Sequence, residues 1–181
     1  MSDVSVGRIV KKTSEVIWQQ LTEEGFMKCP STQYKWKKLA TEFEHLWKCP
    51  NCLGATEGKH VTIQCPPRGG SMFYNYKRFH SIVLMAVVDA MYQFTMVDVG
   101  DYGKPSDGSV FHNSNLGFLI CNNHLDVPQP RLLQGTDKHF PYVFVGDEAF
   151  PLWVNLIKPY PRVTYNFLIQ LQIIVLHVHE E

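Results

Sequence analysis

Apolar residues recur at helical spacing over residues 1–48 of the chain, in two sets. The first set is Val6, Ile9, Val10, Ile17 and Leu21. The second set is Trp36, Leu39, Ala40, Phe43, Leu46 and Trp47. The triplet PST precedes the second set, and its hydroxyl groups are typical of a helix start. The pattern predicts an N-terminal helical segment.

The pattern changes at residues 49–51, after which three stretches are rich in Val, Ile and Leu. These stretches, residues 53–65, 79–90 and 93–100, predict three successive strands. A Ser-Asp pair at 106–107 then predicts a helix that contains Val110, Leu116 and Leu119. A proline-containing loop over residues 122–141 leads to a short apolar strand that ends at Gly146 and Asp147.

Composition and charge narrow the class of protein. Apolar residues make up 45% of the 181 residues, which suits the core of one globular domain. Because 17 Lys and Arg residues balance 17 Asp and Glu residues, no overall field marks a nucleic acid, a membrane surface or an acidic substrate as the partner. No signal peptide and no apolar run of bilayer length are visible, so we expect an intracellular protein without membrane contact. The 5 cysteines are expected to be free thiols.

Two carboxylates interrupt apolar strands. Glu57 lies inside LGATEGKHVTIQCPP, and Asp147 ends the run YVFVG. A buried carboxylate is costly unless it is neutralised or bound to a cation. Two acids facing each other across adjacent strands would hold a hard cation such as Mg²⁺ or Mn²⁺, which suggests phosphoryl-transfer chemistry. The alternative is structural, with Glu57 paired to Lys59 on the same strand face and Asp147 capping a turn.

Other metal-ligand candidates have less support. CPNC at residues 49–52 has the spacing of half a zinc site, but only His60 and Cys65 lie near it in the sequence. Four more aspartates lie at predicted strand ends and turns, where Asp commonly caps the backbone. They are Asp89, Asp98, Asp101 and Asp107. Of these, the aspartates of VVDA and PSDG could also line a cleft behind the metal ligands.

Two groups of basic residues are candidates for contact with nucleic acid. Arg8, Lys11 and Lys12 lie on one turn of the first predicted helix. The stretch YNYKRFH interleaves tyrosines with Lys77 and Arg78, and this combination can contact phosphates and stack on bases. The alternative for both groups is an ordinary solvated surface.

The longer motifs give the chain a family resemblance. NCLGATEGKHVTIQCPPRGGSMFYNYKRFHSIVLMAVVDAMYQFTMVDVGDYGKPSDGSVF, followed by PYVFVGDEAFPLWVNLIKPYPR, resembles the Harbinger transposase-derived nucleases, which are DDE-type endonucleases. The resemblance implies an α/β fold in which residues 49–162 form an RNase H-like mixed sheet with flanking helices. It also implies that residues 1–48 are the end of a helix-turn-helix-like region.

The resemblance assigns roles to the two acids. In this family the aspartate of DGKH and the aspartate of GDEAF bind metal ions together with a glutamate on a later helix. Glu57 stands at the first position and Asp147 at the second. The resemblance therefore implies bound Mg²⁺ or Mn²⁺, with Lys59 or His60 assisting and Asp89 in support.

Two departures from the family pattern bear on activity. Glu57 stands where the family has Asp, and the extra methylene moves the carboxylate by about 1 Å, a displacement that impairs a positioned site. Beyond Arg162 the chain reads VTYNFLIQLQIIVLHVHEE, whereas the family continues into a helix that carries the third acid. We expect residues 163–181 to be a poorly packed tail of a truncated or altered chain.

Two classes of function follow. The first is a metal-dependent DNA endonuclease with reduced activity, and the second is a non-catalytic DNA-associated or interaction protein. For either class, the resemblance implies DNA as the ligand and a Myb-like DNA-binding protein as a partner. It also implies a nuclear location, with a cytoplasmic pool left open.

Overall fold

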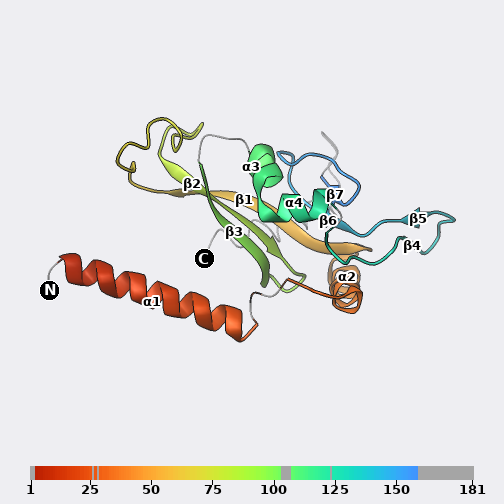
Figure 1. Ribbon diagram of the computed structural model, residues 1–181. Helices are drawn as coiled ribbons and strands as arrows, with labels where there is room; N and C mark the ends of the chain where they lie inside the picture. Colours follow the sequence, from red (N-terminus) through yellow and green to blue (C-terminus); the bar gives the residue numbers. More distant parts are fainter. Residues whose placement is uncertain (1–2, 26, 28, 103–106, 123, 159–181) are drawn as a thin grey trace.

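The computed structural model describes residues 3–25, 27, 29–102, 107–122 and 124–158. Its centre is a five-stranded mixed sheet with helices packed around it (Figure 1). Helices α3 and α4 lie over one side of the sheet, and α1 runs past its β3 edge. The α/β class with a mixed sheet and flanking helices is confirmed.

Four helices occupy the described chain, and the first two confirm the predicted helical segment. Helix α1 spans Asp3–Glu23, and α2 spans Gln33–Trp47. Thr32, from the PST triplet, is the N-cap of α2, and its side-chain oxygen accepts a hydrogen bond from the backbone N–H of Lys35. None of the described helices combines the length and hydrophobicity needed to span a bilayer.

The single helix predicted after residue 106 is wrong, because the structure divides it into two. Helix α3 spans Asp107–Asn113, and α4 spans Asn115–Cys121. Ser114 lies between them and accepts a hydrogen bond from the N–H of Gly117 through its hydroxyl oxygen, which starts a new helix. A methyl group at Gly117 would meet the carbonyl oxygen of Phe111, so the close turn requires glycine there.

The five strands of the sheet run in the order β3-β2-β1-β6-β7. Strands β1 (Cys52–Thr62), β2 (Ser81–Val88) and β3 (Phe94–Tyr102) form an antiparallel meander and confirm the three predicted strands. Strand β6 (Val143–Val145) pairs with β1 in parallel, and β7 (Leu156–Ile157) pairs with β6 in parallel. The predicted loop between α4 and β6 contains a separate two-stranded ribbon, β4 (Arg131–Leu132) with β5 (His139–Phe140).

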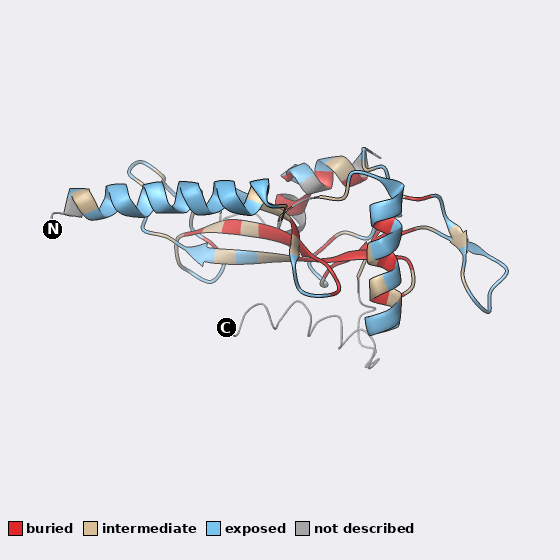
Figure 2. Ribbon diagram, turned by 90° about the horizontal axis from the view of Figure 1, so that it is seen from below, coloured by how far each residue is buried: buried red, intermediate tan, exposed pale blue. Residues whose placement is uncertain are grey.

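The core has one large and one small cluster of buried side chains. The large cluster joins Trp36 of α2 and Phe111 of α3 to the sheet, and the rings of Trp36 and Phe144 meet edge to face at 5.7 Å. The small cluster surrounds Phe43 and includes Ala55 and Val145. Figure 2 shows this buried centre, and it shows α1 exposed along most of its length. The predicted tail, residues 163–181, lies outside the described residues.

Candidate functional site

The parallel pairing of β1 with β6 brings the two predicted metal-binding acids to neighbouring places in the fold. Ala55 lies beside Val145, and Glu57 and Asp147 each follow two residues later. The backbone N–H of Gly146 donates a hydrogen bond of 2.9 Å to the carbonyl oxygen of Ile157, so sheet pairing continues up to the residue before Asp147. Glu57 and Asp147 therefore each lie two residues beyond the last paired residues of β1 and β6, and their direct proximity stays a prediction.

Glu57 lies at the boundary between the buried and the exposed half of β1. Residues 52–56 are buried, whereas Glu57 is half-buried and Lys59 is exposed. The carboxylate of Glu57 is thus not the fully buried one that its apolar strand suggested. Strand β6 is short and pairs only with residues within 52–55 of β1, so the described sheet does not continue beside Glu57 on that side. Glu57 consequently has access to solvent at the end of β6.

The carboxylate of Asp147 also accepts a hydrogen bond that stabilises the turn after β6. Its Oδ1 atom accepts a hydrogen bond of 2.8 Å from the backbone N–H of Ala149, two residues on. The backbone N–H of Phe150 also donates to the carbonyl oxygen of Asp147 at 3.3 Å. The turn-capping role considered for Asp147 is therefore present, and it orients the carboxylate rather than burying it, since Asp147 remains half-exposed.

The two predicted assisting residues lie on opposite faces of β1. Side chains alternate along a strand, so Lys59 shares the face of Glu57 and His60 points to the other face. Lys59 is exposed. His60 places its Nδ1 atom 2.9 Å from the hydroxyl oxygen of Ser81, and its ring meets that of Tyr76 edge to face at 5.6 Å. Lys59 is therefore the better placed of the two for chemistry beside Glu57.

Asp89 and Asp98 hold the backbone at other points of the sheet. Asp89 is buried in the β2–β3 turn, where its Oδ1 atom accepts hydrogen bonds from the N–H groups of Met91 and Gln93 at 2.8 and 2.9 Å. The Oδ2 atom of Asp98 accepts a bond of 2.8 Å from the N–H of Asn115 at the start of α4. Both carboxylates thus have capping roles. A supporting role for Asp89 at the metal site stays a prediction.

The chemistry of Glu57 and Asp147 suits a hard divalent ion. Carboxylate oxygens are the ligands that Mg²⁺ and Mn²⁺ prefer, and Mg²⁺ is commonly held by one or two carboxylates together with water. Among the residues with described positions, no three His, Cys, Asp or Glu side chains gather closely enough to hold a metal ion. The described chain therefore provides two acids just beyond the β1–β6 pairing, and no group of three such side chains.

The cysteines give no support to a zinc site. Cys49 and Cys52 are buried, whereas Cys65 is exposed on the connection between β1 and β2, and all three are free thiols. Burial raises the pKa of Cys52 well above its usual range, and the neighbouring Cys49 raises this pKa further. Among the residues with described positions, these cysteines do not gather with enough further His, Cys, Asp or Glu side chains to form a metal site.

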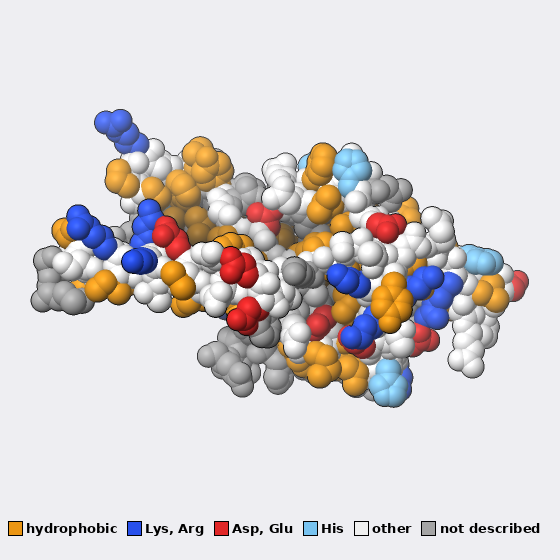
Figure 3. All heavy atoms as spheres, turned by 60° about the horizontal axis from the view of Figure 1, so that its bottom comes forward, with side chains coloured by type: hydrophobic (Ala, Val, Ile, Leu, Met, Phe, Trp, Pro, Cys, Tyr) orange, Lys and Arg blue, Asp and Glu red, His pale blue; other side chains and the backbone are white. Residues whose placement is uncertain are grey.

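The two basic groups lie on different elements of the fold. Arg8, Lys11 and Lys12 are exposed on α1, and Lys11 pairs with Glu15 of the same helix at 3.8 Å. Figure 3 shows basic, acidic and hydrophobic side chains interspersed along this helix. Lys77 and Arg78 are exposed on the connection between β1 and β2. Only the second group is free of carboxylate neighbours in the sequence.

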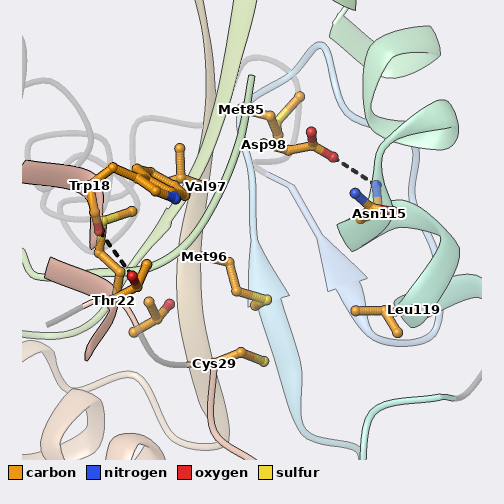
Figure 4. A pocket seen from close by; sticks show the side chains of 11 residues that line it. Trp18, Thr22, Cys29, Met85, Met96, Val97, Asp98, Asn115 and Leu119 are labelled. Carbon is orange, nitrogen blue, oxygen red and sulfur yellow. Dashed lines mark hydrogen bonds between the residues drawn. The ribbon is translucent and has the colours of Figure 1, made fainter. Parts of the chain in front are cut away.

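The structure contains a cavity that the sequence did not predict. It has a volume of about 240 Å³ and lies between the C-terminal half of α1 and the edge strand β3 (Figure 4). Its walls are mainly apolar and include Trp18, Met85, Met96 and Leu119. Cys29 also lines it, and burial raises the pKa of this thiol. These residues come from elements far apart in the sequence, so no local pattern could have revealed the cavity.

Comparison with models of known protein families identifies the family of the chain. The family model described as DDE superfamily endonuclease matches residues 56–171, which is more than half of the chain and includes Glu57 and Asp147. The chain belongs to this family. The resemblance to the Harbinger-derived nucleases is thereby confirmed.

Two curated relatives are similar to the chain. An ALP1-like protein of Arabidopsis thaliana is 28% identical over 152 residues, which cover 81% of this chain and 37% of the relative. HARBI1 of Rattus norvegicus, named as a candidate nuclease, is 26% identical over 116 residues, which cover 64% of this chain and 33% of the relative. The chain thus spans about a third of the length of these relatives. No solved structure matches it.

Proposed function

We propose that this chain is the core of a metal-dependent DNA endonuclease of the transposase-derived DDE type, and that it works at a reduced rate. One observation carries the proposal. The parallel register of β1 and β6 sets Glu57 and Asp147 two residues beyond a paired Ala55 and Val145. Family membership supports the same reaction class, since endonucleases of this superfamily generally use divalent metal ions.

The positions of two acids and one lysine support separate roles in this reaction. Glu57 and Asp147 are the candidate ligands for Mg²⁺ or Mn²⁺. A bound divalent ion supplies Lewis acidity and makes a water molecule a stronger nucleophile. Lys59, exposed on the same strand face as Glu57, adds a positive charge that attracts a phosphate group.

Three features support a reduced rate. The longer Glu side chain displaces the first carboxylate by about 1 Å relative to Asp, and such a displacement lowers the rate at a positioned site. One carboxylate oxygen of Asp147 already accepts a hydrogen bond from Ala149. The described residues provide no third acid beside these two. We therefore expect weak metal binding and slow cleavage.

A second candidate function is DNA association without cleavage. It is favoured by the structural bonds of the carboxylates, because Asp89, Asp98 and Asp147 all cap turns or helices. In this role Arg8, Lys11, Lys12, Lys77 and Arg78 contact DNA. The family resemblance supports a Myb-like DNA-binding partner and a nuclear location for either function.

A cleavage assay with two matched variants tests the proposal. Supercoiled plasmid is incubated with Mn²⁺ and the 181-residue chain, its Asp147→Asn variant, or its Asp137→Asn variant. Asn keeps the Oδ1 acceptor for Ala149 but removes the charge, so the turn survives while the metal ligand is lost. Asp137 is an exposed carboxylate between β4 and β5 and serves as the control.

We expect slow nicking that Asp147→Asn abolishes and Asp137→Asn leaves unchanged. Mn²⁺ binding, followed by electron paramagnetic resonance, should weaken in Asp147→Asn alone. Glu57→Asp by itself is not expected to restore full activity, because the third ligand would still be needed to neutralise charge in the transition state. Cleavage that persists in Asp147→Asn would contradict the metal site, and no cleavage by any variant would favour the second candidate.

A further inference from the structure

The connection between β1 and β2 contains a rigid turn at residues 75–78. The N–H of Arg78 donates a hydrogen bond of 3.0 Å to the carbonyl oxygen of Asn75, which closes the turn, and Arg78 has a positive φ of 67°. Asn75 is buried, donates from Nδ2 to the hydroxyl oxygen of Ser81 at 2.9 Å, and accepts from the N–H of Phe79 at 3.2 Å. A buried anchor thus holds the tip of the turn in place.

The tip of this turn presents an aromatic ring to solvent. Tyr76 is 72% exposed, so most of its side chain faces solvent. The Nζ atom of Lys77 lies 5.5 Å from the centroid of the Tyr76 ring. The ring of His60 meets Tyr76 from the neighbouring strand at 5.6 Å and limits the movement of the tyrosine. The turn therefore displays a positioned ring with a cation over one of its faces, which leaves the opposite face for a stacking partner.

The stretch of chain that contains the turn is positively charged, unlike the chain as a whole. Residues 58–88 contain no Asp or Glu, and they contain Lys59, Arg68, Lys77 and Arg78, all of which are exposed. The net charge of the whole chain is zero. Figure 1 shows the β1–β2 connection extending from the end of the sheet that lies away from α2. An anionic ligand can therefore approach this end without meeting a carboxylate from the same connection.

We propose that the turn of residues 75–78 binds an unpaired nucleotide of a nucleic-acid strand, with its base stacked on Tyr76 and its phosphates beside Lys77 and Arg78. In a duplex both faces of each base are covered by their neighbours, whereas an unpaired base has a free face. Aromatic rings that follow a basic surface are the usual means of binding single strands without sequence preference. The inference rests on the proposed function in taking nucleic acid as the ligand, and it is independent of the metal ions.

The test compares single and double strands in the absence of metal. Fluorescence anisotropy with EDTA present measures the affinity of the 181-residue chain for a labelled oligo-dT, a labelled oligo-rU and a matched DNA duplex. Tyr76→Ala and Tyr76→Phe are compared with Tyr34→Ala. Tyr34 is 78% exposed on α2 and, like Tyr76, is followed by an exposed lysine, so it controls for the loss of a surface Tyr.

We expect oligo-dT to bind more tightly than the duplex. Tyr76→Ala should weaken the binding of oligo-dT by about fivefold or more, because base stacking on an aromatic ring is worth about 1–3 kcal/mol. Tyr76→Phe should retain the affinity, and Tyr34→Ala should not change it. The ratio of the dT and rU affinities identifies DNA or RNA as the strand.

Three outcomes would overturn the inference: no binding of either oligonucleotide by the unmodified chain, equal affinity for oligo-dT and duplex, or a Tyr76→Ala variant that binds like the unmodified chain. The result can be separated from that of the cleavage assay. A chain that binds oligo-dT through Tyr76 but does not cleave plasmid supports the turn and not the metal site, and the reverse pattern supports only the metal site.

Discussion

The close packing of Gly54 against two neighbouring strands allows a test of how the sheet positions the acids. A methyl group on Gly54 would lie 2.5 Å from Cγ1 of Val87, 3.2 Å from the carbonyl oxygen of Val88 and 3.4 Å from Cδ1 of Phe144. Carbon atoms prefer a separation of about 3.5–4.0 Å, so the first contact is about 1 Å too close. Val87 is fully buried and β-branched, and it has few other rotamers. The substitution Gly54→Ala must therefore shift β1 against β2 or β6.

The expected loss of stability follows from this overlap. Overpacking a core typically costs about 1–3 kcal/mol, and the lower entropy of the unfolded chain with Ala offsets up to about 1 kcal/mol. We expect the free energy of unfolding to fall by about 1–2 kcal/mol. For a chain of this size the corresponding fall in Tm is about 2–8 °C. Because the shift lies on β1 between its two neighbours, Mn²⁺ binding at Glu57 and Asp147 should weaken as well.

Urea unfolding of four variants decides whether the contact with Val87 is the cause. Val87→Ala alone should destabilise the chain through the lost side-chain packing. Gly54→Ala combined with Val87→Ala should be more stable than the sum of the two effects by about 0.5 kcal/mol or more, since Ala at position 87 leaves room for the new methyl group. Gly7→Ala on α1 is the control, because nothing lies within 4 Å of its added methyl group. Additive effects of the two core substitutions would refute the reasoning.

Two further outcomes concern single buried residues. Asn51 has a positive φ of 59°, donates from Nδ2 to the carbonyl oxygens of Phe140 and Pro141, and accepts from Nε of Arg131. Asn51→Ala should lower the free energy of unfolding in urea by about 2–4 kcal/mol, and an unchanged midpoint would contradict this role. For Cys52, burial raises the pKa of the thiol in the folded chain, so the folded chain keeps a proton that the unfolded chain releases. Stability should be unaffected at pH 7 and should fall as the pH rises past about 8.5, the ordinary Cys pKa, and Cys52→Ala should remove this part of the fall.

The sequence by itself determined most of the elements and singled out the two acids. Helical and strand periodicities are local properties, so the spacing of apolar residues predicted α1, α2 and the three-stranded meander. A carboxylate within an apolar strand stands out without any structure, which is why Glu57 and Asp147 could be singled out. The long motifs added the family, and the family match confirmed it.

Only the tertiary structure decided how these elements meet. The parallel pairing of β1 with β6 joins residues about ninety positions apart, and its short length leaves Glu57 half-exposed rather than buried. The division of the predicted helix at Ser114 depends on a turn in which Gly117 packs against the backbone of Phe111. The display of Tyr76 depends on the bond from Asn75 to Ser81 across the β1–β2 connection. Periodicity reports which side of an element is apolar, whereas burial and proximity depend on where the neighbouring strands begin and end, and this information is not local.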